Sequence, residues 1–281
     1  MHGDMDQFWA HLTASMRLSA LLQPVAVLRP RSRSMINICN FLHVISESTN
    51  WSLVTIPWDE SSPASMTAAP LFYEDGTLEI TYGTTASHIE LIWRITRLTQ
   101  ATRYYEMHQI SPPPGVQTAL DRLTVAVESL RTVENIQRLP QDCDEHAQSL
   151  LKQHIETFAL SIKVYFYSSL RTCDQERMDL CVQEISCKLN AIEQQKQSMG
   201  KHYAKTATIA WPGFIASCES RQDHRGLWRR WWSKMIGYGI GNIEALWSIV
   251  QESWRLKDAG SAITPAWLPV LKANRKFILA V

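Results

Sequence analysis

The stretch Thr206–Trp267 reads TATIAWPGFIASCESRQDHRGLWRRWWSKMIGYGIGNIEALWSIVQESWRLKDAGSAITPAW and holds seven of the eleven tryptophans of the chain. A packed tryptophan buries about 150–250 Å² of surface, so rings at this density predict a core of one defined shape. The order of residues predicts an apolar helix containing Trp211, then a basic and aromatic helix, a glycine-rich turn, and a further helix that ends near Trp254.

Apolar residues recur at steps of three and four outside this stretch as well. Three such series run from Val116 to Leu130, from Leu151 to Tyr165 and from Met178 to Ile192. This spacing places one apolar stripe along each helix. We therefore predict an all-α protein, a single irregular multi-helix domain of antiparallel helix pairs with a Trp-rich C-terminal core.

The first 80 residues carry a weaker signal than residues 81–281, which we expect to form the main all-α domain. Residues 1–80 are expected to contribute a helical segment and a loop, with helices over Met5–Leu22 and Met35–Glu47. Short strands near Trp51–Ile56 or Thr77–Tyr82 remain alternatives to helix or loop in this part of the chain.

Helix ends are predicted from local chemistry. Ser87 and Glu90 have the spacing of a capping box, which would start a helix at Ser87. Thr264 followed by proline is expected to open a last helix that continues through Ala280. The turn at Gly237–Gly241 predicts glycines at positive φ, with Asn242 capping the next helix.

The overall composition excludes several classes of protein. The formal net charge is +1, so no global field would draw the chain onto nucleic acid or an anionic membrane. Apolar residues make up 45% and charged residues 20%, as in ordinary soluble domains. No apolar run reaches the roughly 20 residues that a membrane helix needs, so we expect an intracellular protein with no membrane partner.

Six cysteines are scattered along the chain, and none forms a Cys-x-x-Cys pair. A zinc cluster needs ligands close together in sequence, because a short loop must close around the ion. Scattered cysteines in helical segments are typical of buried, reduced thiols. We therefore expect no bound metal and no cofactor.

Four segments carry a resemblance to a known family. They are ATIAWPGFIASCE at Ala207–Glu219, the Gly-x-Gly-Asn turn at Gly239–Asn242 followed by QESW at Gln251–Trp254, ALSIKVYFYSSLR at Ala159–Arg171 and YGTTASHIELIWRITRLTQ at Tyr82–Gln100. In this order they resemble the fungal-specific transcription factor domain, the helical regulatory region of fungal zinc-cluster regulators, in the subgroup typified by arginine-metabolism activators. The resemblance covers roughly residues 80–281.

This resemblance implies transcription regulation in the nucleus, through contacts with other regulators or a dimer partner. In the family a six-cysteine zinc cluster reads DNA, and the cysteine spacing of this chain does not match that cluster. The expectation is therefore a regulator that does not bind a specific DNA sequence alone and that acts through partners.

Two other functions remain as alternatives, an α-helical biosynthetic enzyme and an interaction scaffold without a role in transcription. The acidic run Asp142–Glu145 resembles a metal-binding cluster, but acids in the first turn of a helix also complement the helix dipole, and we favour that interpretation. The sequence contains no His-Glu-x-x-His and no Gly-x-Ser-x-Gly. No catalytic residue is predicted.

The basic helix after Glu219 is the candidate docking site. Trp228, Trp231 and Trp232 share one face and are expected to point into the core. Arginine with tryptophan is common where partner proteins bind, and arginine with stacked aromatic rings also suits phosphates. We favour an ordinary amphipathic helix, whose arginines stay in water or pair with carboxylates, over phosphate binding, and a partner-docking face remains as an alternative. The predicted docking residues are Arg221, Arg225, Arg229 and Arg230.

Overall fold

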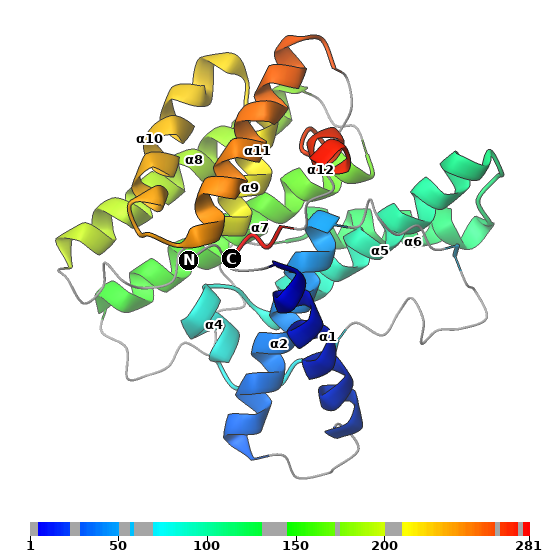
Figure 1. The fold of residues 1–281 in the computed structure, drawn as a ribbon, viewed down its shortest axis with the longest axis horizontal. Helices are drawn as coiled ribbons and strands as arrows, with labels where there is room; N and C mark the ends of the chain where they lie inside the picture. Colours follow the sequence, from blue (N-terminus) through cyan, green and yellow to red (C-terminus); the bar gives the residue numbers. More distant parts are fainter. Residues whose placement is uncertain are drawn as a thin grey trace.

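The computed structural model describes residues 5–22, 29–50, 57–58, 70–130, 145–171, 175–199, 210–261, 265–274 and 278–281. These residues form helices and contain no strand, which confirms the predicted all-α class. In chain order the elements are α1 (Met5–Leu22), α2 (Pro30–Asn50), α4 (Thr77–Tyr82), α5 (Ala86–His108), α6 (Pro114–Glu128), α7 (Glu145–Ser169), α8 (Gln175–Ser198), α9 (Ala210–Glu219), the 3-10 helix η3 (Gln222–His224), α10 (Arg225–Ile236), α11 (Gly241–Asp258) and α12 (Leu268–Asn274) (Figure 1).

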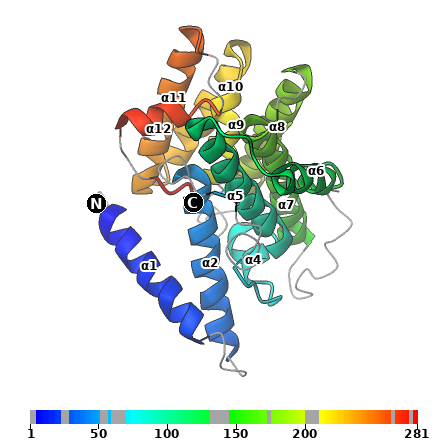
Figure 2. The same cartoon turned by 90° about the vertical axis from the view of Figure 1, so that its right-hand side faces the viewer.

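Helix α9 lies at the centre of the C-terminal half, enclosed by α7, α8 and α11 (Figures 1 and 2). All of its residues are buried, in agreement with its AWPGFIASCE sequence, which has an apolar residue on every side. A helix that is apolar all round is stable in water only when neighbours cover it completely. The neighbouring helices are therefore fixed in position by α9.

Helices pair in antiparallel fashion around this centre. The side-chain amide of Gln153, near the start of α7, donates a hydrogen bond at 2.7 Å to the side-chain oxygen of Gln195, near the end of α8. Helices α10 and α11 are also antiparallel. The rings of Trp232 and Trp247 stack between them, with their centres 5.9 Å apart. The antiparallel pairs follow from the short connections between consecutive helices.

Trp211 on α9 joins four helices. Its ring is stacked 5.8 Å from Phe158 and edge-on to Tyr165, both on α7. Its indole N–H donates to the Ser48 hydroxyl of α2 at 2.9 Å. The Tyr165 hydroxyl donates to the Ser48 carbonyl at 3.0 Å and also contacts the Thr96 hydroxyl of α5. This node therefore ties α2, α5, α7 and α9 together.

The tryptophans of α10 point inward, as predicted. Trp228, Trp231 and Trp232 are at most 1% exposed. Trp231 lies directly over Gly213 of α9, where an added Cβ would come within 2.3 Å of the indole ring. Glycine at position 213 thus allows α10 to approach α9 closely.

The N-terminal helices agree with the sequence-based expectation in part. Helix α1 has the predicted bounds, whereas α2 is longer than predicted at both ends. The strand alternative at Thr77–Tyr82 is wrong, because these residues form α4 between glycines at positions 76 and 83 that have positive φ. The alternative at Trp51–Ile56 lies outside the described residues.

The predicted last helix is too long. Helix α12 ends at Asn274, and residues 278–281 are not helical. The Ile278 carbonyl accepts a hydrogen bond from Asn50 of α2 at 2.9 Å, and the Leu279 carbonyl accepts one from Asn242 of α11 at 2.6 Å. These contacts hold residues 278–281 in a non-helical conformation against α2 and α11.

Two predicted caps are also wrong in detail. Helix α5 is capped by Thr85, whose hydroxyl accepts from the His88 amide, and not by Ser87. Asn242 lies inside α11 and donates to the C-terminal residues, so it does not cap that helix. Gly239 does have positive φ, as the turn requires.

Replacing Trp211 with alanine is expected to destabilise the protein by about 3–5 kcal/mol, since a fully buried indole would leave a cavity. Trp211→Phe keeps a ring but loses the bond to Ser48, and should cost about 1–2 kcal/mol. Urea unfolding followed by tryptophan fluorescence measures both. An Ala variant as stable as the unmodified chain would show that this node does not hold the helices together.

Two buried histidines predict acid sensitivity. Burial lowers the pKa of His88 on α5 to about 4. Burial, together with the nearby positive charge of Lys196, lowers the pKa of His154 on α7 to about 3. Both groups are neutral in the folded chain at neutral pH, whereas in the unfolded chain they take up a proton below about pH 6.5.

The unfolded state therefore binds more protons as pH falls, and stability is expected to decline from about pH 6.5 downward by roughly 2 kcal/mol per histidine at pH 5. Urea unfolding at pH 7.5 and pH 5 measures this loss. His88→Gln and His154→Gln should each make the loss smaller, whereas His108→Gln, at an exposed position, should leave it unchanged. Equal losses in all four proteins would contradict the assignment.

Candidate partner-docking surface

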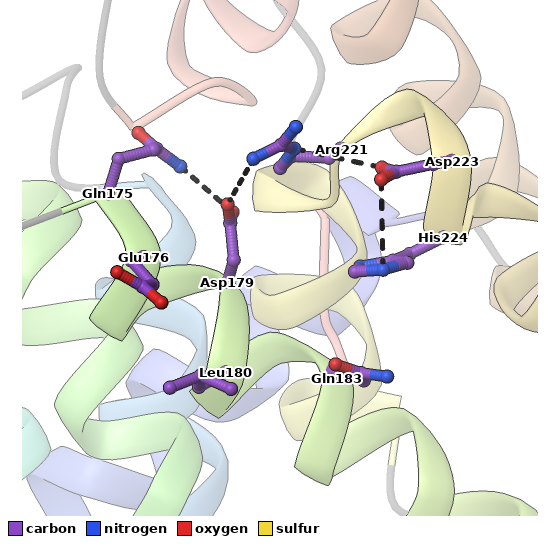
Figure 3. A pocket seen from close by; sticks show the side chains of 8 residues that line it. All are labelled: Gln175, Glu176, Asp179, Leu180, Gln183, Arg221, Asp223 and His224. Carbon is purple, nitrogen blue, oxygen red and sulfur yellow. Dashed lines mark hydrogen bonds and ion pairs between the residues drawn. The ribbon is translucent and has the colours of Figure 1, made fainter.

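A surface pocket of about 540 Å³ lies where the first turns of α8 meet η3 (Figure 3). Its walls combine three carboxylates with one guanidinium, two amides, an imidazole and one apolar side chain. Positively and negatively charged groups at an exposed surface are accessible to complementary charges of a partner without any change in the fold. The lining residues are Gln175, Glu176, Asp179, Leu180, Gln183, Arg221, Asp223 and His224.

Arg221 bridges the two sides of this pocket (Figure 3). Its guanidinium donates to Asp179 of α8 at 3.0 Å and lies 3.7 Å from Asp223 of η3. The hydrogen bond from Arg221 to Asp179 raises the pKa of Arg221. Gln175 donates to the second oxygen of Asp179 at 2.9 Å, so this carboxylate is held from two directions. Arg221 itself is 57% exposed and remains accessible.

Arg225, one turn further on, has a different environment. Only 4% of it is exposed, and both terminal nitrogens donate to the Asp258 carboxylate at 2.6 and 2.9 Å. Its guanidinium lies 5.0 Å from the Trp254 ring. The hydrogen bond from Arg225 lowers the pKa of Asp258. Arg225 therefore fastens the start of α10 to the end of α11 inside the chain.

Arg229 and Arg230 are exposed on the outer face of α10. The Arg229 guanidinium lies 5.6 Å from the Trp254 ring, on the side of α10 that faces α11. Arg230 is also exposed and has no ion-pair partner among the described residues. The four predicted arginines thus do not form one cluster, because one lines the pocket, one is buried and two lie on an exposed helix face.

The acidic side of the pocket was missed by sequence reasoning. Glu176 and Asp179 lie on α8, more than forty residues before Arg221, and only the fold brings them beside it. The nearest sequence signal was the apolar series that begins at Met178 and predicts this helix. The contact between α8 and η3 depends on tertiary packing, which local sequence patterns do not encode.

Within the residues that the structure describes, no group of three His, Cys, Asp or Glu side chains is placed to hold a metal ion. Burial raises the pKa of the Cys218 thiol well above its usual range, so this cysteine is protonated at neutral pH. Among the described helices, none is both long and apolar enough to cross a membrane. Cys143 and Cys173 lie outside the described residues.

Comparison with protein families gives one match across nearly the whole chain. The model of the fungal specific transcription factor domain aligns with residues 1–280. The chain belongs to this family. Family membership confirms the resemblance of the segments around Tyr82, Ala159 and Ala207, and the match also includes the first 80 residues.

The chain is also similar to a curated yeast protein. The chain is 26% identical over 106 residues to arginine metabolism regulation protein II of Saccharomyces cerevisiae. The matched part is 37% of this chain but only 12% of the relative, so the chain corresponds to a small part of that regulator. No solved structure matches the chain.

Both comparisons support a role in transcription regulation. For a domain of this family, the described geometry separates structural arginine from accessible arginine. Arg225 belongs to the framework, while Arg221, Arg229 and Arg230 remain at the surface.

Arg225→Ala is expected to destabilise the domain by about 1–3 kcal/mol, because it removes a buried side chain together with a two-point contact to Asp258. Arg225→Lys should recover little, since an ammonium cannot make the bidentate contact. Thermal unfolding measures the effect, with Arg230→Ala as the exposed control, which should change stability by less than about 0.5 kcal/mol. A control that destabilises as much as Arg225→Ala would contradict this distinction.

Proposed function

We propose that this chain is the regulatory module of a nuclear transcription regulator, and that it acts through contacts with other regulatory proteins. The match to the family model over residues 1–280 carries this proposal. In this proposal the chain does not read a DNA sequence by itself, uses no cofactor and catalyses no reaction.

The surface supports action through protein contacts. The accessible arginines Arg229 and Arg230 lie beside a tightly packed tryptophan core, and arginine next to aromatic rings is frequent where proteins bind tightly. The net charge of +1 provides little attraction for the phosphate backbone, on which DNA affinity largely depends. Partner binding thus suits this surface better than binding to DNA.

A reporter assay in yeast tests the proposal. The chain is fused to an unrelated DNA-binding module, and the expected result is a several-fold change in reporter output relative to that module alone. The fusion carrying Trp211→Ala should show a weaker effect, because the loss of stability lowers the amount of folded chain. The chain without the module should leave the reporter unchanged. A folded fusion with no effect on the reporter would contradict the proposal.

A binding assay with purified chain tests the DNA part of the proposal. Any affinity for duplex DNA should be independent of sequence and should disappear as salt is raised, as expected for contacts with phosphate alone. Strong preference for one sequence would contradict the proposal that the chain needs a partner to reach its target.

A further inference from the structure

The outer side of α10 is open to solvent. Gly226, Arg229, Arg230 and Ser233 are exposed there, and Lys234 is half-buried. These residues recur at steps of three and four, so they share one side of the helix, opposite the three buried tryptophans. A Cβ added at Gly226 would meet no atom within 4 Å, as expected for an uncovered surface. The side formed by Arg229, Arg230 and Lys234 is named the basic face.

The basic face is not neutralised within the part of the chain that the structure describes. Its three cations form no ion pair with the described residues, whereas every lysine and arginine of the neighbouring helices α8 and α11 has a carboxylate partner. These pairs are Arg177 with Glu128, Lys188 with Glu156, Lys196 with Glu193, Arg255 with Glu252 and Lys257 with Glu219. The positive charge of the basic face is thus available to a molecule from outside.

Carboxylates limit the basic face at both ends of α10. Asp223 lies two residues before the helix begins, and Asp258 pairs with the buried Arg225 at the same end. Glu244 is exposed in the first turn of α11, directly after the turn that follows α10. The 12 residues of α10 span about 18 Å. The positive surface is therefore short, and a long polyanion such as DNA would extend over these carboxylates.

The arginines of the basic face suit carboxylates in particular. The Arg229 guanidinium lies 5.6 Å from the Trp254 ring, and this ring is fixed by a hydrogen bond from its N–H to the Ser217 carbonyl at 2.6 Å. A planar guanidinium beside an aromatic ring loses little conformational freedom when it binds an acid. It can also donate to both oxygens of one carboxylate, while Lys234 adds a point charge.

We propose that the basic face binds a short acidic segment of a partner protein, in which Asp and Glu side chains lie close together. Carboxylates of this segment pair with Arg229 and Arg230, and with Lys234 one turn further along α10. This inference rests on the proposed function and deepens it, since it gives the chemistry of the partner segment. Binding is measured on purified protein without a reporter, so its failure is distinguishable from failure of the transcriptional role.

Fluorescence anisotropy with a labelled peptide of alternating Asp and Glu residues tests the proposal. The unmodified chain should bind this peptide with a dissociation constant of about 10–100 µM in about 0.05 M salt, and about tenfold more weakly in about 0.5 M salt. A peptide with Asn and Gln in the same places should not bind. The variant Arg230→Glu/Lys234→Glu should weaken binding about tenfold or more, because like charges then face each other.

The matched control is Arg31→Glu/Arg122→Glu, which makes the same change in net charge. Both arginines are exposed, and they lie on α2 and α6, away from α10 (Figures 1 and 2). This variant should keep its affinity for the acidic peptide to within about twofold, since long-range charge is screened by salt. Circular dichroism and thermal unfolding establish that both variants are folded.

Three results would overturn the proposal. The first is an unmodified chain that does not bind the acidic peptide. The second is an equal loss of affinity in the control, because net charge alone would then explain the binding. The third is duplex DNA that binds more tightly than the peptide at the same salt and loses this affinity in Arg230→Glu/Lys234→Glu, which would make the basic face a phosphate-binding surface.

Discussion

Trp211 occupies the point at which α2, α5, α7 and α9 meet, and the rest of the structure depends on its enclosure. The indole packs between two aromatic rings of α7 and donates its N–H to Ser48 of α2. The apolar surface that it buries drives the four helices together, while the hydrogen bond fixes the rotation of α2 relative to α9. Through this node the N-terminal helices become part of the same core as the Trp-rich C-terminal half.

The C-terminal core contains indoles with and without hydrogen-bond partners. Ser217 alone serves two of them, accepting from Trp232 at its hydroxyl and from Trp254 at its carbonyl. Within the described residues, Trp228 and Trp231 bury their N–H groups without an acceptor. Each such group costs about 1–3 kcal/mol, a loss that burial of the large ring offsets. In this part of the core, the burial of the indole rings thus outweighs the loss of hydrogen bonds at their N–H groups.

Local sequence patterns predicted what depends on periodicity and missed what depends on distant partners. The steps of three and four among Trp228, Trp231 and Trp232 placed all three rings in the core, because a helix presents such residues on one face. The patterns could not show that Arg225 is buried by Asp258 or that Arg221 meets Asp179, since these pairs form only after helices pack. The last helix was extended too far for the same reason, as Asn50 and Asn242 hold its final residues.

The division between framework and surface follows from the two-point contact of Arg225. A guanidinium whose two terminal nitrogens both donate to one carboxylate has few donors available for another molecule. Arg229 and Arg230, a turn further along α10, are both exposed, although Arg229 lies beside the Trp254 ring of α11. A partner would therefore contact the middle of α10, while Arg225 at the start of α10 would keep the helix in position.

The bond between Asn50 and Ile278 spans 228 residues and has a consequence for synthesis on the ribosome. Helix α2 is made early, and Ser48 in its last turn can pair with Tyr165 and Trp211 once those residues have been made, but Asn50 meets this partner only after residue 278 has left the exit tunnel. Contacts between residues so distant in sequence slow folding, because a large loop must close before they form. The N-terminal helices can therefore pack against α5 early, whereas the final hydrogen bonds of α2 form only late in translation.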